Sequence, residues 1–175
     1  MKRLFALLLA AAVLSCAGCS DKKNSFSDWR SEEAIAASAD LLHEFDAGNK
    51  MIYPDYFGGR WFSEDGKKML VYVTPSYNSE LDFLLEKHDC VEFIEVAYSQ
   101  NELNSLAEQY TAELAESFPE LDHGGVGIDV SENCVAVHLS VETLDNDGIM
   151  SELKAHFEGR PVKFVGYVTG VALAL

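Results

Sequence analysis

Two stretches of the chain share one layout, and this repetition constrains the fold more than any other feature of the sequence. Residues 124–139, GGVGIDVSENCVAVHL, alternate apolar with small or polar side chains on both sides of a polar turn, which predicts a β-hairpin. Residues 58–73, GGRWFSEDGKKMLVYV, repeat this layout without a gap, with Asp65-Gly66 at the turn. We therefore expect the chain to form the same hairpin twice.

The segments that follow the two hairpins also correspond to each other. Residues 91–98, VEFIEVAY, and residues 162–169, VKFVGYVT, each read as a strand behind a predicted helix. The pattern indicates two ββαβ units related by internal duplication, with convergence as the alternative. Only three of the sixteen aligned hairpin positions are identical, namely Gly58/Gly124, Gly59/Gly125 and Val71/Val137. We interpret the paired glycines as bends that lead into a strand.

Two longer helices are predicted outside the hairpins. The first is expected to follow a capping box of Ser25 and Asp28, and the second, which connects the units, a capping box of Ser99 and Glu102. In the first helix, apolar spacing predicts an inward stripe made of Ile35, Ala39, Leu42 and Phe45, supported by Trp29, Ala34 and Leu41. The tyrosines of the following aromatic loop, residues 51–57, are expected to cover the edge of the core.

Each unit is expected to hold one shorter helix. In the first unit Ser79 and Asp82 are predicted to cap a helix that carries Leu81, Leu84 and Leu85. In the second, a helix near residues 148–157 is predicted to turn Ile149, Leu153 and Phe157 inward. The expected fold is thus α+β, with two ββαβ units, a long connecting helix and an N-terminal helix.

The N-terminal residues read as an export signal. Lys2 and Arg3 precede an apolar run over residues 4–14, which at 11 residues is about half of what a membrane-spanning helix needs. The following residues, Ser15-Cys16-Ala17-Gly18-Cys19, resemble the lipobox of bacterial lipoproteins, whose cysteine receives the lipid. This resemblance implies lipidation at Cys19, with Cys16 as the alternative, and an ordinary secretory signal is the competing interpretation.

The predicted organisation therefore has five segments. They are the export signal 1–19, the N-terminal helix and aromatic loop 20–57, the first unit 58–99, the connecting helix 100–122, and the second unit with an apolar tail 123–175. The formal net charge is −16, and it becomes −18 once Lys2 and Arg3 are removed with the signal. Such an acidic chain is expected to bind neither nucleic acid nor, by electrostatic attraction alone, anionic lipid.

A second resemblance covers residues 57–168. This region resembles the pro-domains of alpha-lytic-type secreted serine proteases, through Gly58-Gly59, Trp61-Phe62-Ser63, Asp65-Gly66 and Val71-Tyr72-Val73 in the first unit and Gly124-Gly125, Ile128-Asp129 and residues 135–139 in the second. The resemblance implies a domain that binds a protease as folding catalyst and inhibitor. We expect no protease domain to follow the module, which departs from that family, so a free-standing relative with another partner is at least an equal expectation.

Motifs for catalysis or metal binding are sparse. The five histidines belong to no HExxH motif, and no GxSxG nucleophile motif or zinc-finger spacing is found. Asp145 and Asp147 lack the full spacing and the terminal glutamate of an EF-hand loop. We therefore expect no metal, no cofactor and no catalytic residue that the sequence can identify.

The favoured function is an exported, lipid-anchored, non-enzymatic protein-binding module of pro-domain or inhibitor type. Its partner would be a protease-like or an envelope protein, and its membrane contact the lipid anchor. The alternatives are a small extracytoplasmic enzyme and a structural envelope lipoprotein without a ligand. A binding module predicts an exposed apolar patch or sheet edge, whereas an enzyme predicts a pocket in which histidines and carboxylates converge.

Two further hypotheses concern single segments. Cys90 and Cys134 each begin a predicted strand, and an exported protein permits a disulfide between them; two separate thiols are the slightly preferred alternative. The apolar C-terminus is expected either to extend the last strand into the core, which we prefer, or to bind a partner through Val171, Leu173 and Leu175.

Overall fold

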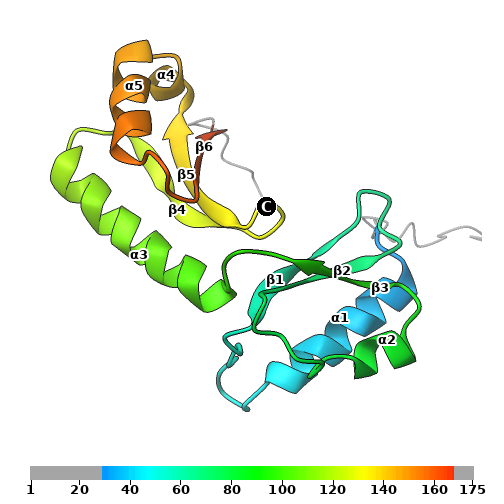
Figure 1. The fold of residues 1–175 in the computed structure, drawn as a ribbon. Helices are drawn as coiled ribbons and strands as arrows, with labels where there is room; N and C mark the ends of the chain where they lie inside the picture. Colours follow the sequence, from blue (N-terminus) through cyan, green and yellow to red (C-terminus); the bar gives the residue numbers. More distant parts are fainter. Residues whose placement is uncertain (1–28, 168–175) are drawn as a thin grey trace, which may run out of the picture.

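A computed structural model describes residues 29–167, and it confirms the α+β fold with two three-stranded sheets (Figure 1). In the first sheet β1 (Phe57–Phe62) pairs antiparallel with β2 (Met69–Val73), which pairs parallel with β3 (Val91–Glu95). The short helix α2 (Phe83–Lys87) makes the crossover between the parallel strands. The first unit is therefore ββαβ, as predicted.

The second sheet repeats this topology. Its antiparallel pair is β4 (His123–Asp129) and β5 (Cys134–Ser140), and β6 (Val162–Tyr167) lies parallel to β5. Two helices, α4 (Val141–Leu144) and α5 (Asp147–His156), make the crossover. The sequence did not predict α4, because Val141 continues the alternation of β5; instead Ser140 accepts a hydrogen bond from the Thr143 N–H and starts a helix.

The two units also agree in register. Val71 lies opposite Arg60 and Phe93, and the corresponding Val137 lies opposite Val126 and Phe164. Each first strand is interrupted at the same point, where the second glycine of the pair has a positive φ, 120° at Gly59 and 129° at Gly125. The paired glycines thus form a bulge in each unit, since a residue with a side chain rarely adopts that conformation.

The N-terminal helix α1 (Glu32–Phe45) begins at Ser31, whose hydroxyl accepts a hydrogen bond from the Ala34 N–H at 3.1 Å. The predicted inward stripe was right for Ala34, Leu41 and Phe45, which are buried, and wrong for Ile35 and Ala39, which are exposed. The other buried residues of the helix are Ala37 and Ser38. Small side chains at Ala34, Ala37 and Ser38 let this face of the helix pack on the sheet, while Ala36 and Ala39 face solvent. The expected cap at Ser25 lies outside the described residues.

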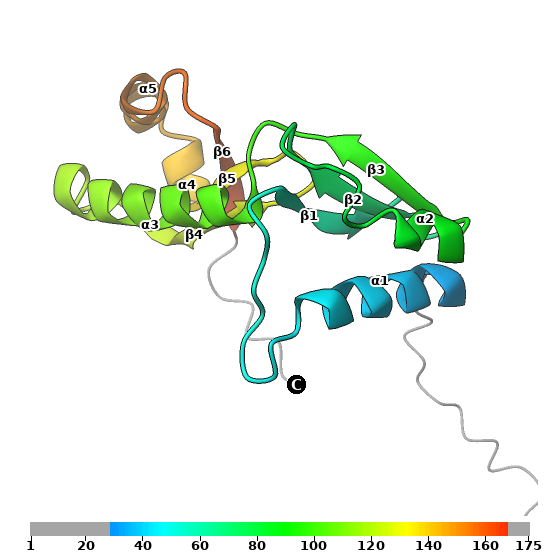
Figure 2. The same cartoon turned by 60° about the horizontal axis from the view of Figure 1, so that its bottom comes forward.

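The first core lies between α1, α2 and one face of the first sheet. Its members include Leu41, Met69, Val71, Leu81 and Leu84, all without measurable exposure. Tyr53 and Tyr56 of the loop before β1 pack against it, as expected. Figure 2 shows α1 along one side of this sheet, and no helix of the described residues lies on the opposite side.

The short helix α2 is not capped as predicted. Ser79 has a φ of 69°, and the Asp82 carboxylate makes no cap hydrogen bond. It instead accepts a hydrogen bond of 2.6 Å from the Tyr77 hydroxyl, because Tyr77 is held close by packing on the first core. Leu85, expected to point inward, is 44% exposed.

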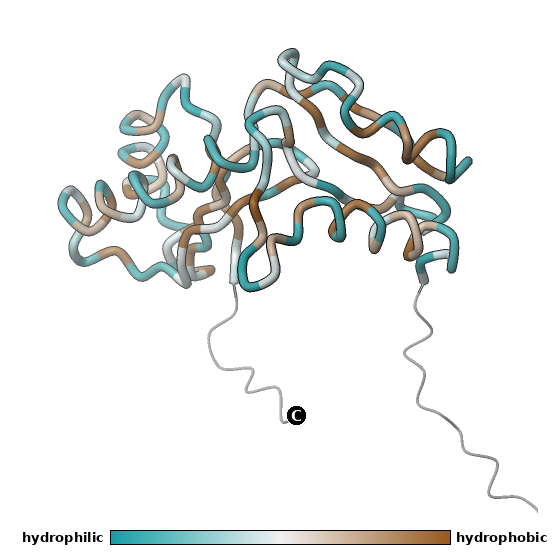
Figure 3. The backbone as a smooth tube through the Cα atoms, turned by 90° about the horizontal axis from the view of Figure 1, so that it is seen from below, coloured by the Kyte–Doolittle hydropathy of each residue, from teal (hydrophilic) through white to brown (hydrophobic). Residues whose placement is uncertain are grey.

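The connecting helix α3 (Gln100–Ser117) confirms the second capping box. The Ser99 hydroxyl accepts a hydrogen bond from the Glu102 N–H, and the Glu102 carboxylate accepts one from the Ser99 N–H. Its buried residues Leu103, Tyr110 and Leu114 pack with α5 on one face of the second sheet. Figure 3 shows that hydrophobic residues concentrate in the strands, whereas the helices alternate in hydropathy. Among residues 29–167, none of the helices has the length and apolarity required to cross a membrane.

The units are joined by the turn between β4 and β5. The side-chain amide of Asn133 accepts a hydrogen bond from the Tyr98 N–H at 2.9 Å and donates one to the Tyr98 carbonyl at 2.8 Å. Val130 of the same turn packs against Gly59, where an added Cβ would come within 2.6 Å of it. The turn of the second hairpin therefore contacts the first unit at the point where α3 begins.

We expect Asn133→Gly to lower the free energy of unfolding by about 1–2 kcal/mol, because two hydrogen bonds are lost. Glycine suits the φ of 50° at this position, so backbone strain does not contribute. Urea denaturation measures the change. The control is Asn78→Gly, at an exposed position whose side chain makes no hydrogen bond within residues 29–167; an equal loss in both variants would contradict the joining role of Asn133.

Candidate functional site

A groove of about 500 Å³ runs along the free edge of β1, and we call it the β1 groove. Its lining comes from the segment before α1, the last turn of α1, the loop before β1, both faces of β1, the first residue of α3 and the β4–β5 turn. The residues are Trp29, Arg30, Leu42, Tyr53, Phe57, Arg60, Trp61, Phe62, Gln100 and Val130. The chain has two tryptophans, and both line this groove.

Local structure positions the aromatic side chains. Trp29 packs over the β1–β2 turn at Gly66, where an added Cβ would approach the Trp29 ring to 2.7 Å. Its ring also meets Phe62 edge-on, with centroids 6.3 Å apart. Trp29 is 55% exposed and Trp61 is 54% exposed, so about half of each large apolar surface faces solvent.

The backbone of β1 is available along this groove. The Ser63 N–H bonds to the Lys68 carbonyl, and pairing alternates along an antiparallel ladder, so Arg60 and Phe62 turn their N–H and C=O groups away from β2. No strand of residues 29–167 pairs with that edge. The groove therefore combines unpaired main-chain groups with exposed aromatic rings.

Arg60 and Arg30 bring positive charge to the groove. Its guanidinium carbon lies 6.0 Å from the centre of the Phe62 ring, and that of Arg30 lies 5.0 Å from the same centre. Burial lowers the pKa of Arg60, and the nearby positive charge of Arg30 lowers it further. No carboxylate among residues 29–167 forms a salt bridge with Arg60.

Apart from Arg30, the other basic side chains of the described chain are placed differently from Arg60. Those within salt-bridge distance of a carboxylate are Lys67, Lys68, Lys87, Arg160 and Lys163. Lys50 and Lys154 have no such partner in the described chain, but both are exposed, and water solvates their charges. Arg60 is thus a partly buried cation with aromatic neighbours and no described counter-charge.

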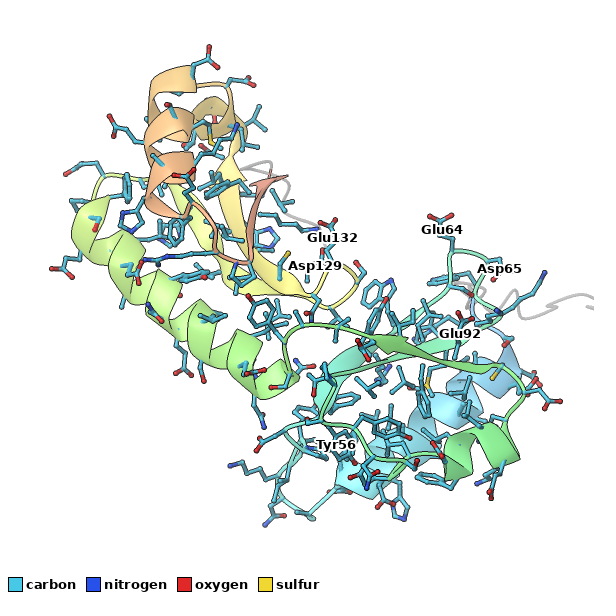
Figure 4. All side chains as sticks on the ribbon, in the orientation of Figure 1. Tyr56, Glu64, Asp65, Glu92, Asp129 and Glu132 are labelled. Carbon is cyan, nitrogen blue, oxygen red and sulfur yellow. The ribbon has the colours of Figure 1, made fainter. Side chains whose placement is uncertain are left out.

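The β4–β5 turn closes one end of the groove with Val130. Burial acts to raise the pKa of Asp129 in this turn, but hydrogen bonds from Lys163, Ser131 and the Glu132 N–H together outweigh it and hold the pKa at about 2. Figure 4 shows Asp129 and Glu132 on this turn. The charged network fixes the turn, and with it the position of Val130.

A second, more polar pocket of about 800 Å³ lies where β2 and β3 end and α3 begins. Its polar groups are largely occupied by local hydrogen bonds. Glu102 belongs to the capping box, Thr74 and Ser76 bond to each other at 2.8 Å, and Asn101 donates to the Tyr53 carbonyl and to Asp55. No histidine, lysine, arginine or cysteine lines it.

The histidines are not gathered at a site. His88 pairs with Asp40 at 2.7 Å beside the first core, and His156 pairs with Glu113 at 3.2 Å beside the second. The Nδ1 atom of His123 is buried without a partner in the described chain. Neither the β1 groove nor the polar pocket includes a histidine, and residues 29–167 hold no group of three or more potential metal ligands.

The site residues proposed from the sequence lie elsewhere. Cys90 and Cys134 are buried, free thiols in different units, and burial raises the pKa of both. Cys16, Cys19, Val171, Leu173 and Leu175 lie outside the described residues, so their roles stay predictions. Sequence reasoning missed the β1 groove; the available signal was Arg60-Trp61-Phe62, which loads both faces of one edge strand with large side chains.

Comparison with known proteins assigns no family to the chain. No protein-family model matches it, and no curated protein matches it significantly. The geometry of the β1 groove is therefore the best indication of function that the chain offers.

We expect Arg60→Met to leave the free energy of unfolding unchanged or to raise it by up to about 1 kcal/mol, because a desolvated charge is removed. Arg160→Met is the matched control, since Arg160 also lies over aromatic rings, those of Tyr110 and Phe157, but pairs with Glu113. It should lower the free energy of unfolding by about 1 kcal/mol. Urea denaturation of both variants provides the comparison. If Arg60→Met lowers the free energy of unfolding as much as Arg160→Met does, the claim that Arg60 has no counter-charge in the described chain is contradicted.

Proposed function

We propose that this chain is an exported, lipid-anchored protein-binding module and that it contacts its partner through the β1 groove. The observation that carries the proposal is the meeting of two half-exposed tryptophans with an arginine that has no described counter-charge, along an unpaired strand edge. Tryptophan, tyrosine and arginine are the residue types that contribute most to binding energy at protein interfaces. Burial of these exposed apolar side chains against a partner would be more favourable than leaving them in contact with water.

The two alternative functions have less support from the described residues. An enzyme needs a nucleophile or base held beside a reacting group, and the polar pocket offers carboxylates that are already engaged in capping and loop hydrogen bonds. A structural lipoprotein without a ligand needs no exposed aromatic groove. The binding module accounts for Trp29, Trp61 and Arg60 together.

The proposed anchor sets the location of the partner. If Cys19 carries the lipid, Trp29 follows it by ten residues, which span at most about 36 Å when fully extended. The β1 groove would then lie near the membrane surface, within reach of an envelope protein. The resemblance to protease pro-domains makes a protease-like protein the other candidate partner.

The apolar tail remains a second proposed contact. Val171, Leu173 and Leu175 follow the last described strand, and their contribution is separable from that of the groove by deletion. Tail and groove would act together if both touch the same partner.

A pull-down from the producing cell's envelope tests the groove. We expect Trp61→Ala to abolish capture of a protein that the unmodified chain enriches, because a central aromatic contact is often worth 2 kcal/mol or more. Leu85→Ala is the matched control, since Leu85 is also an exposed apolar residue but lies on α2 outside the groove. Capture that survives Trp61→Ala, or is lost equally with Leu85→Ala, would overturn the assignment.

Cell fractionation tests the anchor. We expect Cys19→Ser to move the protein from the membrane fraction to the soluble fraction, because the lipid attachment point is lost. Cys16→Ser, three residues earlier, should remain with the membrane. The reverse pattern would assign lipidation to Cys16, and release of neither variant would contradict a lipid anchor.

A further inference from the structure

We infer that the partner inserts an extended segment into the β1 groove, where it pairs with β1 as an added strand and places one carboxylate side chain on Arg60. This inference rests on the proposed function and names the chemistry of the segment recognised. Two independent features of the described chain carry it: the outward main-chain groups of β1 and the charge of Arg60.

The unpaired main-chain groups of β1 favour a partner segment in the extended conformation. Arg60 and Phe62 present their N–H and C=O groups to the groove, and the spacing of alternate residues along a strand matches that of a second strand. Edge strands with free backbone groups are the places where peptides add to sheets. Trp29 and Val130 line the groove beside β1, and they leave room for a short segment.

Side-chain alternation then decides what the segment carries. Successive residues of an added strand point to opposite faces of the sheet. On the α1 side they would meet Arg60, Phe62 and Tyr53, and on the other side Trp61. A single acidic residue with apolar neighbours satisfies both faces.

The charge of Arg60 selects a carboxylate over a neutral or basic group. A guanidinium over an aromatic ring binds a carboxylate through two parallel hydrogen bonds, and partial burial strengthens that pair. The chain as a whole is strongly acidic and would repel a segment with many acidic residues. The geometry therefore favours one carboxylate within an apolar segment over a polyacidic tail.

Selection from a displayed library of random seven-residue peptides tests the inference on the purified protein. We expect the recovered peptides to share one aspartate or glutamate between apolar residues. Tryptophan fluorescence reports their binding, since both tryptophans of the chain line the groove. Replacing the acidic residue of such a peptide with its amide should weaken binding at least about tenfold.

Matched variants test the pairing with Arg60. Arg60→Gln should weaken binding of the acidic peptide at least about tenfold and leave binding of the amide peptide unchanged. Arg60→Lys, which keeps the positive charge, should weaken binding of the acidic peptide less than Arg60→Gln does. Lys67→Gln, at an exposed cation on the neighbouring turn, should have no effect beyond about twofold. Thermal melting confirms that each variant is folded. Two further peptides carry N-methyl groups, one at the odd and one at the even backbone positions. Only the peptide whose methyl groups replace the N–H groups that face β1 should lose binding.

The outcomes separate this inference from the proposed function. Peptides that change tryptophan fluorescence but carry no acidic residue, ignore Arg60→Gln or tolerate N-methylation in both registers would overturn the inference and leave the groove as a protein-binding site. Failure to recover any peptide, or recovery of peptides whose binding Trp61→Ala does not weaken, would count against both. Light scattering that shows a dimer dispersed by Arg60→Gln would assign the groove to a second copy and overturn the partner proposed here.

Discussion

Each unit of this chain has enough helix to cover one face of its three-stranded sheet, and this limit shapes the rest of the molecule. Val71 and Val137 lie at the centre of the buried faces, where α1 and α2 cover the first sheet and α3 and α5 the second. Within residues 29–167 the outer strands keep a free edge, and no helix of that range covers the opposite faces (Figures 1 and 2). Burial on one side therefore leaves recognition surfaces on the other.

The contact between the units also completes the candidate site. Asn133 holds the backbone of Tyr98, and Val130 of the same turn packs on Gly59 and lines the β1 groove. The bulge at Gly59 thus has two consequences: it bends β1, and it lets the second unit approach without a side chain in the way. A shift of the second hairpin would open the groove at that end.

The sequence predicted what depends on local patterns and missed what depends on packing. The hairpins, their gap-free correspondence and the capping box of Ser99 and Glu102 follow from residues a few positions apart. The inward face of α1 could be read only in part that way, because apolar spacing favoured Ile35 whereas packing on the sheet buries Ala37 and Ser38. The groove was missed because Trp29 and Trp61 are distant in sequence and line one groove only in the folded chain.

Arg60 is more informative because the chain is rich in carboxylates. Local bonds hold one carboxylate in each of the two turns beside the groove: Asp65 accepts from the Ser63 hydroxyl and the Lys67 N–H, and Asp129 pairs with Lys163. Each of these two carboxylates stabilises the turn to which it belongs, and neither pairs with Arg60. The same bonds that make the hairpins rigid therefore keep the guanidinium available to a carboxylate from outside, which is why we regard Arg60 as a recognition residue rather than a structural one.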